Sequence, residues 1–244
     1  MRLVAARSGL VCLLLVLIVV IPRTAAGQWY GGAYLGANYT QPATVTVNVP
    51  ADGLALDYEK VAFEGKPFES PQYYGARVGR FIDAPKRFAV EFEFIHLKVF
   101  AKTAEHYTVT GTFGTAPPDA ATGPMNVVVQ RYSMSHGLNF LLGNLVWRRP
   151  LTDRLSFVAR GGAGATLPHA ETEVLHRGQQ QYEWAGFGMQ GGAGVDVHLG
   201  KGLSLAGEYK FTYARPTITL AGGEGRTTSA THQVTFGLAV AFPH

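Results

Sequence analysis

Two acids, a histidine and a lysine fall close together in one short stretch of the chain, Glu91–Lys98. Carboxylate and imidazole groups can hold a divalent metal ion together or exchange protons in acid–base catalysis. If the stretch is a β-strand, strict alternation places Glu91 and Glu93 on one face and His96 on the other. A bulge at Phe94-Ile95 would instead bring all four groups to the same side.

A second polar stretch, Gln130–Asn139, reads Q-R-Y-S-M-S-H-G-L-N and contains another histidine. The candidate catalytic set is therefore Glu91, Glu93, His96 and His136. No fixed-spacing metal motif joins these residues, so the identity of any metal stays unknown, and an ordinary strand histidine is the alternative for His136. Ser135 and His136 are neighbours that a strand would point to opposite faces, which argues against a serine hydrolase.

Strands are the elements that must position these groups, because apolar residues alternate with small or polar ones along much of the chain. The clearest case is the last one, in which Val234, Phe236, Leu238, Val240 and Phe242 share one face. The sequence predicts eight strands: Trp29–Thr40, Gln72–Ile82, Arg87–Ala101, Val127–Trp147, Arg154–Thr166, Tyr182–Leu199, Leu203–Arg215 and Ser229–Phe242. Ala43–Val49 could extend the first strand into a hairpin.

The first 26 residues are typical of a cleaved export signal. Two arginines, Arg2 and Arg7, precede the apolar run Gly9–Ile21, and the small residues around Ala26 suit a signal peptidase. The predicted domains are a signal peptide at 1–26 and one β-barrel domain at 27–244; an uncleaved anchor helix is the alternative. The single cysteine, Cys12, lies in the signal, so we expect no disulfide in the exported chain.

Charge and hydropathy exclude two classes of protein. Without the first 26 residues, which hold three arginines and no acids, 18 basic and 17 acidic residues remain. The chain has no basic stripe and no RNA-binding motif, so we expect no nucleic-acid partner. No other stretch reaches 18 apolar residues, which argues against a helical membrane span.

The connections between the predicted strands alternate in length. Short turns follow the second, fourth and sixth strands, at 83–86, 149–153 and 200–202. Long loops occupy roughly 41–71, 102–126, 167–181 and 216–228. Short periplasmic turns and long external loops, with aromatic residues near the strand ends, are typical of outer-membrane barrels. The predicted fold is therefore an all-β, eight-stranded antiparallel up-and-down transmembrane β-barrel with its apolar face toward lipid, in a bacterial outer membrane.

An eight-stranded barrel has little open interior, so charges that point inward must be paired. The predicted interior salt-bridge network is Arg77, Glu91, Glu93, Arg131, Arg160, Asp196, Glu208 and Lys210. Four acids balance four bases, and such a network would block a diffusion pore. The two glutamates thus have two interpretations, one structural and one catalytic.

Four segments resemble the OmpA-type family of small outer-membrane β-barrels: W-Y-G-G-A-Y-L-G-A (29–37), Y-Y-G-A-R-V-G-R-F (73–81), L-S-L-A-G-E-Y-K-F (203–211) and G-L-A-V-A-F (237–242). The resemblance implies the barrel fold, insertion by the outer-membrane assembly machinery, and lipid and lipopolysaccharide as partners of a monomer. Chains of this family usually end on the phenylalanine that the machinery reads, whereas here Pro243 and His244 follow Phe242.

Within this class, E-F-E-F-I-H-L-K (91–98) and the Gln130–Asn139 stretch are similar to segments of rhizobial lipid A oxidase-like proteins. That similarity implies oxygen-dependent oxidation of lipid A with a divalent-cation requirement. Two functions therefore stay open: a barrel with a closed, charge-filled interior and long external loops that interacts with lipopolysaccharide, or a lipid A-modifying enzyme. The enzyme needs Glu91, Glu93, His96 and His136 to converge.

Overall fold

The computed structural model describes residues 28–114 and 122–242. The predicted signal peptide, Pro243 and His244 lie outside the described residues. Among those that are described, no helix is long and apolar enough to cross a membrane.

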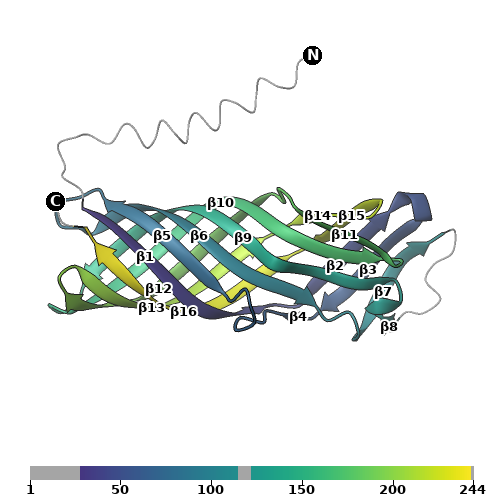
Figure 1. Ribbon diagram of the computed structural model, residues 1–244, viewed down its shortest axis with the longest axis horizontal. Coiled ribbons are helices and arrows are strands. Elements are labelled where there is room, and N and C mark those ends of the chain that lie inside the picture. The colour runs from purple at the N-terminus through teal and green to yellow at the C-terminus, as the bar shows by residue number, and fades with distance from the viewer. Residues whose placement is uncertain (1–27, 115–121, 243–244) are drawn as a thin grey trace, which may run out of the picture.

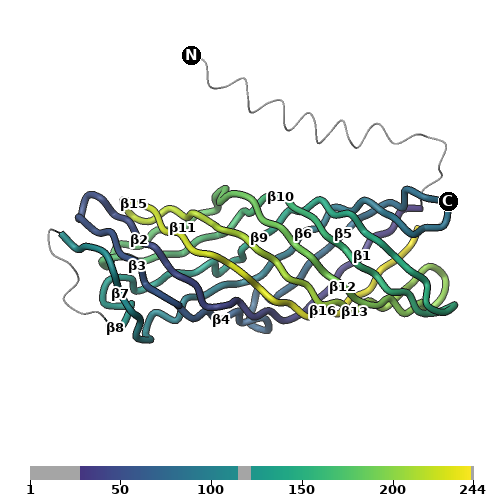
Figure 2. Tube along the Cα trace, turned by 180° about the vertical axis from the view of Figure 1, so that it is seen from behind, coloured from purple at the N-terminus to yellow at the C-terminus, as the bar shows by residue number. Residues whose placement is uncertain are grey.

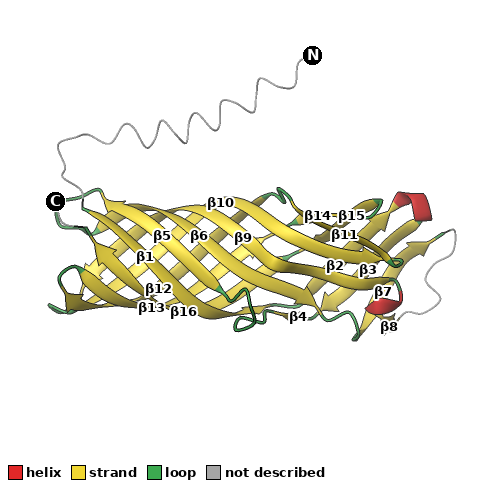
Figure 3. Cartoon of the chain, viewed as in Figure 1, coloured by secondary structure: helices red, strands yellow, loops and turns green. Residues whose placement is uncertain are grey.

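Eight antiparallel strands form a closed barrel (Figures 1 and 3). They are β1 Trp29–Thr40, β5 Tyr74–Phe81, β6 Phe88–Ala101, β9 Val129–Pro150, β10 Leu155–Val174, β12 Phe187–Gly200, β13 Leu203–Ala214 and β16 Ser229–Ala241. Each strand pairs with the next in this order, and β16 pairs with β1 from Tyr30 opposite Ala241 to Thr40 opposite Thr231. The predicted up-and-down barrel is confirmed.

Two strand boundaries differ from the predicted ones by more than three residues. β10 continues to Val174 rather than ending at Thr166, because its second half forms a hairpin with β11, Arg177–Tyr182. β12 consequently begins at Phe187 rather than Tyr182. The third long loop is thus largely strand, and it lengthens the barrel wall beyond the point where β12 ends its pairing with β10.

The outer wall confirms the predicted outward apolar face. In β16 the side chains of Val234, Phe236 and Leu238 are exposed, whereas Gln233 and Thr235 are buried inside. We call the exposed apolar outer wall the apolar belt; it includes Leu35, Val78, Phe92, Leu145, Phe187, Met189, Val195, Leu205, Val234, Phe236, Leu238 and Val240. A continuous apolar surface of this size is stable only where lipid covers it.

The other long loops build a second sheet at the end of the barrel away from the start of β1 and the end of β16 (Figures 1 and 2). Its strands are β2 Ala43–Val49, β3 Leu54–Val61, β7 His106–Phe113, β8 Thr122–Pro124, β14 Thr217–Leu220 and β15 Gly223–Thr227. They pair in the order β14-β15-β2-β3-β7-β8, so hairpins from three different loops share one sheet. The predicted Ala43–Val49 extension is its β2. Two short 3₁₀ turns, η1 Pro50–Asp52 and η2 Met125–Val127, and the strand β4 Phe63–Glu64 complete the long-loop end.

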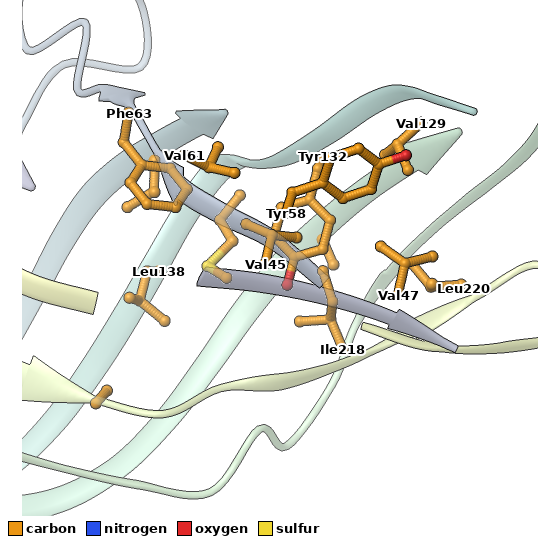
Figure 4. Packing of buried hydrophobic residues seen from close by; sticks show 14 of the residues in the cluster. Val45, Val47, Tyr58, Val61, Phe63, Val129, Tyr132, Leu138, Ile218 and Leu220 are labelled. Atoms are coloured by element: carbon orange, nitrogen blue, oxygen red, sulfur yellow. The ribbon is translucent and has the colours of Figure 1, made fainter. Parts of the chain in front are cut away.

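Two layers of side chains occupy much of the barrel interior. We call the first the polar layer; it consists of Arg77, Glu91, Glu93, Asn144, Arg160, Gln190, Glu208 and Lys210, all buried. The second, the apolar plug, starts at Leu142, Phe140 and Leu138 of β9 and continues into the second sheet. Figure 4 shows residues of the plug: Val45, Val47, Tyr58, Val61, Phe63, Val129, Tyr132, Leu138, Ile218 and Leu220.

Candidate functional site

Six charged side chains meet in the polar layer, three acids and three bases. Glu208 accepts a hydrogen bond from Arg77 at 3.0 Å and forms an ion pair with Arg160 at 3.2 Å, and Lys210 pairs with Glu93. Arg160 also lies 3.5 Å from Glu91. Because an isolated ion costs several kcal/mol to bury, this balanced set is the arrangement that a lipid-surrounded interior requires.

Neutral side chains complete the coordination of the two buried glutamates. The Tyr30 hydroxyl donates to Glu91 at 2.9 Å, and the Tyr34 hydroxyl donates to Glu93 at 2.8 Å. The Asn144 amide donates to Glu91 at 3.0 Å and to Glu93 at 2.9 Å. Both carboxylates are thus buried and hydrogen-bonded on the interior side of the wall.

The hydrogen bond from Tyr34 to Glu93 depends on a glycine in β5. Gly75 pairs with Tyr34 across the β1–β5 ladder, and a Cβ atom at residue 75 would overlap the Tyr34 ring. The absent side chain lets the ring lie across β5 and reach Glu93. Arg77 and Lys210 then lie over the faces of the same ring, 4.8 and 4.6 Å from its centre.

Two members of the predicted network lie elsewhere. Asp196 lies on the interior side nearer the short turns, where it lines a cavity of about 580 Å³ with Arg148 and Arg160, and within the described ranges it forms no salt bridge. Arg131 is exposed on the outer wall and pairs with Glu171 at 3.5 Å. Its placement in the interior was wrong because its neighbour Tyr132 takes the inward position in the apolar plug.

The four candidate catalytic residues are divided by the barrel wall. Glu91 and Glu93 face the interior, whereas His96 is on the opposite side of β6, where its ring stacks on Tyr74 at 4.8 Å. The β5–β6 register runs without a break from Tyr74 opposite His96 to Phe81 opposite Ala89, so β6 has no bulge at Phe94-Ile95. The structure does not bring the glutamates and His96 together.

A bulge does occur, but in β9. Leu138 pairs with Leu97 and Met134 with Val99, so three residues of β9, 135–137, lie opposite one residue of β6. Gly137 has a φ of +100°, a conformation that favours glycine. Alternation from buried Met134 and Leu138 would place His136 inside, but the bulge turns it outward, where its side chain is 54% exposed.

The outward-turned His136 meets two residues of β10. Its Nδ1 lies 3.2 Å from Oε1 of Glu171, and Nδ1 of His169 lies 3.8 Å from the same oxygen. The two imidazole rings are 4.7 Å apart, centre to centre. We call these three residues, His136, His169 and Glu171, the outer-wall cluster; one donor atom from each lies within 4.8 Å of the others.

The outer-wall cluster lies beyond the apolar belt. Along the outward face of β10, Ala163 and Ala165 are followed by Leu167 and then by His169 and Glu171, so the wall changes from apolar to polar. A hydrogen bond from Ser135, aided by the two histidines and Arg131, holds the pKa of the Glu171 carboxyl below its usual range. Glu171 is therefore a carboxylate at neutral pH and available as a ligand.

Sequence reasoning did not identify His169 and Glu171 because they fell in a predicted loop. The signal that could have found them is the spacing of residues 169 and 171, which share a face once the segment is recognised as a strand. For His136, no local pattern shows the bulge. Because the bulge adds two residues, inward and outward positions alternate in the same way before and after it.

The family comparison identifies the domain. Residues 11–242 match the model of the outer membrane protein beta-barrel domain. A search of curated proteins finds no match.

Three solved structures with a similar arrangement are distant from this chain in sequence. The chain is similar to outer membrane protein AlkL, with 14% identity over 91% of this chain and 95% of that one and a TM-score of 0.47. It is also similar to the outer membrane protease OmpT of Escherichia coli (7% identity, 90% and 99% covered, TM-score 0.46). Ail of Yersinia pestis gives 11% identity, 88% and 99% covered and a TM-score of 0.37.

The family match spans nearly the whole chain, and the closed eight-stranded barrel with its apolar belt agrees with it. The resemblance to small OmpA-type barrels is confirmed. This chain belongs to the outer membrane protein beta-barrel domain family and is a bacterial outer-membrane protein.

Proposed function

We propose that this protein is a closed, monomeric outer-membrane barrel whose external rim interacts with lipopolysaccharide. The observation that carries the proposal is a set of exposed cations where the strands leave the apolar belt at the long-loop end. Lys102 directly follows β6, Arg131 lies near the start of β9, and Arg215 directly follows β13. We infer that the phosphates of outer-leaflet glycolipids meet the wall at this long-loop end.

The rim cations can exchange their present partners for phosphate. Lys102 lies 3.3 Å from Glu105, and both side chains are about half exposed. Exposed pairs of this kind contribute roughly 0–1 kcal/mol, so a multiply charged phosphate can replace them at small cost. Arg215 donates from Nε to the Tyr213 hydroxyl at 2.6 Å, which holds its guanidinium beside an aromatic residue of the outer wall.

The interior supports the closed part of the proposal. Between the polar layer and the second sheet, the barrel is packed with fully buried side chains such as Ile95, Leu138 and Phe140. No ion-sized path can run through such packing without displacing it. We expect no steady conductance in planar bilayers; stepwise openings of uniform size in the native protein would contradict a closed barrel.

The geometry favours this proposal over a lipid A-modifying enzyme. That activity needed Glu91, Glu93, His96 and His136 at one point, and the first two face the interior while the others lie on the outer side of the wall. We expect identical lipid A mass spectra from cells with and without the gene. A mass difference confined to the proximal glucosamine would restore the enzymatic alternative.

Binding of lipopolysaccharide by detergent-solubilised protein tests the rim directly. We expect the double variant Lys102→Gln/Arg215→Gln to bind several-fold more weakly than the native protein, because two phosphate partners are lost. The matched control is Lys86→Gln/Lys201→Gln, which removes two cations from the short-turn end. Equal loss in both double variants, or no loss in the rim variant, would contradict a rim-specific interaction.

A further inference from the structure

The outer-wall cluster contains a donor set that neither the barrel fold nor the proposed function uses. Two imidazoles and one carboxylate come from two paired strands, His136 from the bulge of β9 and His169 and Glu171 from β10. We propose that His136, His169 and Glu171 bind a divalent first-row transition metal, of which Zn²⁺ suits the ligands best, on the external outer wall of the barrel.

The ligand types decide which metals fit. Two histidines and one glutamate form the donor set of many three-ligand zinc sites, which keep a fourth position for water or another ligand. Imidazole nitrogen suits Zn²⁺, Cu²⁺ and Ni²⁺, whereas Ca²⁺ and Mg²⁺ prefer six or more oxygens. The donor atoms of the cluster therefore disfavour Ca²⁺ and Mg²⁺.

The distances need only small side-chain adjustments. A tetrahedral zinc ion with bonds of about 2.0–2.1 Å places its ligand atoms about 3.3 Å apart. His136 and Glu171 already hold Nδ1 and Oε1 at 3.2 Å, and His169 holds its Nδ1 3.8 Å from that oxygen. The backbone is fixed by the β9–β10 ladder, so side-chain rotation alone completes the triangle.

One of the donor atoms has no other use in the structure. Nδ1 of His169 is buried and has no hydrogen-bond partner, although the His169 ring packs tightly against Tyr182 with 4.4 Å between centres. A buried polar atom without a partner costs free energy, and a metal bond would satisfy it. Nδ1 of His136, by contrast, lies 3.1 Å from Oγ of Ser135, a contact that the metal bond would replace.

Neighbouring charges leave one side of the carboxylate open to the ion. Arg131 lies 3.5 Å from Oε2 of Glu171, while both histidines approach Oε1. The guanidinium therefore orients the carboxylate from the far side, as hydrogen-bonded second partners do in metal sites. The fourth metal position would face the exposed side of His136, outside the apolar belt.

The bound ion would link the bulge of β9 to the extension of β10. The two extra residues of the bulge interrupt the β9–β10 hydrogen-bond ladder between Leu138 and Ser133, so few backbone bonds join the strands there. The predicted consequence is a site that stabilises the external extension of the wall, with no role for the polar layer. Arg131 belongs to both proposals, but the rim variant Lys102→Gln/Arg215→Gln leaves the outer-wall cluster unchanged, so the metal site and the lipopolysaccharide-binding rim are tested separately.

Calorimetric titration of Zn²⁺ into the purified, chelator-treated protein in detergent tests the site. We expect one ion per chain, and at least tenfold weaker binding in each of His136→Ala, His169→Ala and Glu171→Gln. The matched control is His176→Ala, because His176 is an exposed histidine of the same β10–β11 hairpin and lies 3.9 Å from Glu173. Its binding should equal that of the native protein.

Folding of each variant is checked by heat-modifiable gel mobility, which reports the closed barrel. Zn²⁺ should also slow proteolysis of the extension in the native protein and in His176→Ala, but not in the three cluster variants. Binding with no preferred stoichiometry, equal loss in the control, or unchanged binding in all three folded cluster variants would each overturn the proposal.

Discussion

The polar layer and the apolar plug fill neighbouring levels of the same barrel with opposite chemistry. In the polar layer, eight side chains from six strands are joined by ion pairs and hydrogen bonds, as in the meeting of Glu93, Tyr34 and Lys210. In the plug, the contacts are mainly between aliphatic and aromatic side chains, and about half of these side chains come from loops. The comparison separates two tasks, closing the barrel and attaching the external sheet to it.

Hydrogen bonds need fixed geometry and apolar contacts do not, which explains the positions of the polar layer and the apolar plug. The polar layer is enclosed by barrel strands alone, whose register is fixed, so its side chains can be held at hydrogen-bonding distances. The plug must join barrel strands to hairpins such as β2–β3 and β14–β15, whose attachment depends on contact area. We therefore expect changes in the polar layer to affect the whole barrel and changes in the plug to affect the external sheet.

The largest effect is expected from Lys210→Met, which removes a fully buried cation. It leaves Glu93 without its closest charged partner and should lower the free energy of unfolding by about 4 kcal/mol, since a lone buried charge costs about 3–5 kcal/mol. Urea unfolding in lipid vesicles measures it. Adding Glu93→Gln should recover part of the loss, and Lys201→Met in an exposed turn should change little.

If Lys210→Met and Lys201→Met unfold at the same urea concentration, the polar layer contributes nothing to barrel stability. The apolar plug would then be the layer that stabilises the barrel.

A smaller and more local effect is expected from Leu220→Ala in β14. Leu220 is buried in the plug, and truncating a buried leucine costs about 3 kcal/mol through lost contacts and the cavity left behind. Limited proteolysis should cut β2–β3 and β14–β15 faster, while heat-modifiable mobility of the barrel persists. Val127→Ala, at an exposed valine of the same end, is the control.

Loss of barrel mobility in Leu220→Ala together with faster loop cleavage would show that the two layers unfold as one unit. The division of tasks between them would then be wrong.

The smallest effect is expected from Tyr34→Phe. The variant removes a hydroxyl that donates to Glu93 at 2.8 Å but keeps the ring beneath Arg77 and Lys210. A hydrogen bond to a charged group contributes about 1.5–3 kcal/mol, so we expect a loss of about 2 kcal/mol in the same urea experiment. Tyr39→Phe, at an exposed tyrosine of β1, should unfold like the native protein.

The barrel could be predicted from sequence because its strands are regular and their neighbours follow one another. Alternation alone located β1 to the residue and β16 to within one. The second sheet could not be predicted in full, since the β15–β2 and β3–β7 pairs join segments far apart in the chain and leave no local period. Only its first strand, β2, had a readable pattern.

The site was less predictable than the fold for a reason visible at His136. Candidate residues were selected by chemistry, but the face that each one occupies depends on bulges that sequence alternation does not show. Glu91 and Glu93 followed the alternation and entered the interior network. His136 departed from it through a bulge in β9, and its partners His169 and Glu171 lay in a segment taken as loop.

The six-stranded external sheet has a consequence for how the surface of this protein can vary. Hairpins from three separate loops share its hydrogen bonds, in the order β14-β15-β2-β3-β7-β8. An antibody or phage that recognises this surface would contact residues distant in sequence, so its epitope would be lost on denaturation. Mutations that alter the outline of one hairpin would also need compensating changes in the neighbouring hairpin, so these loops are expected to diversify together.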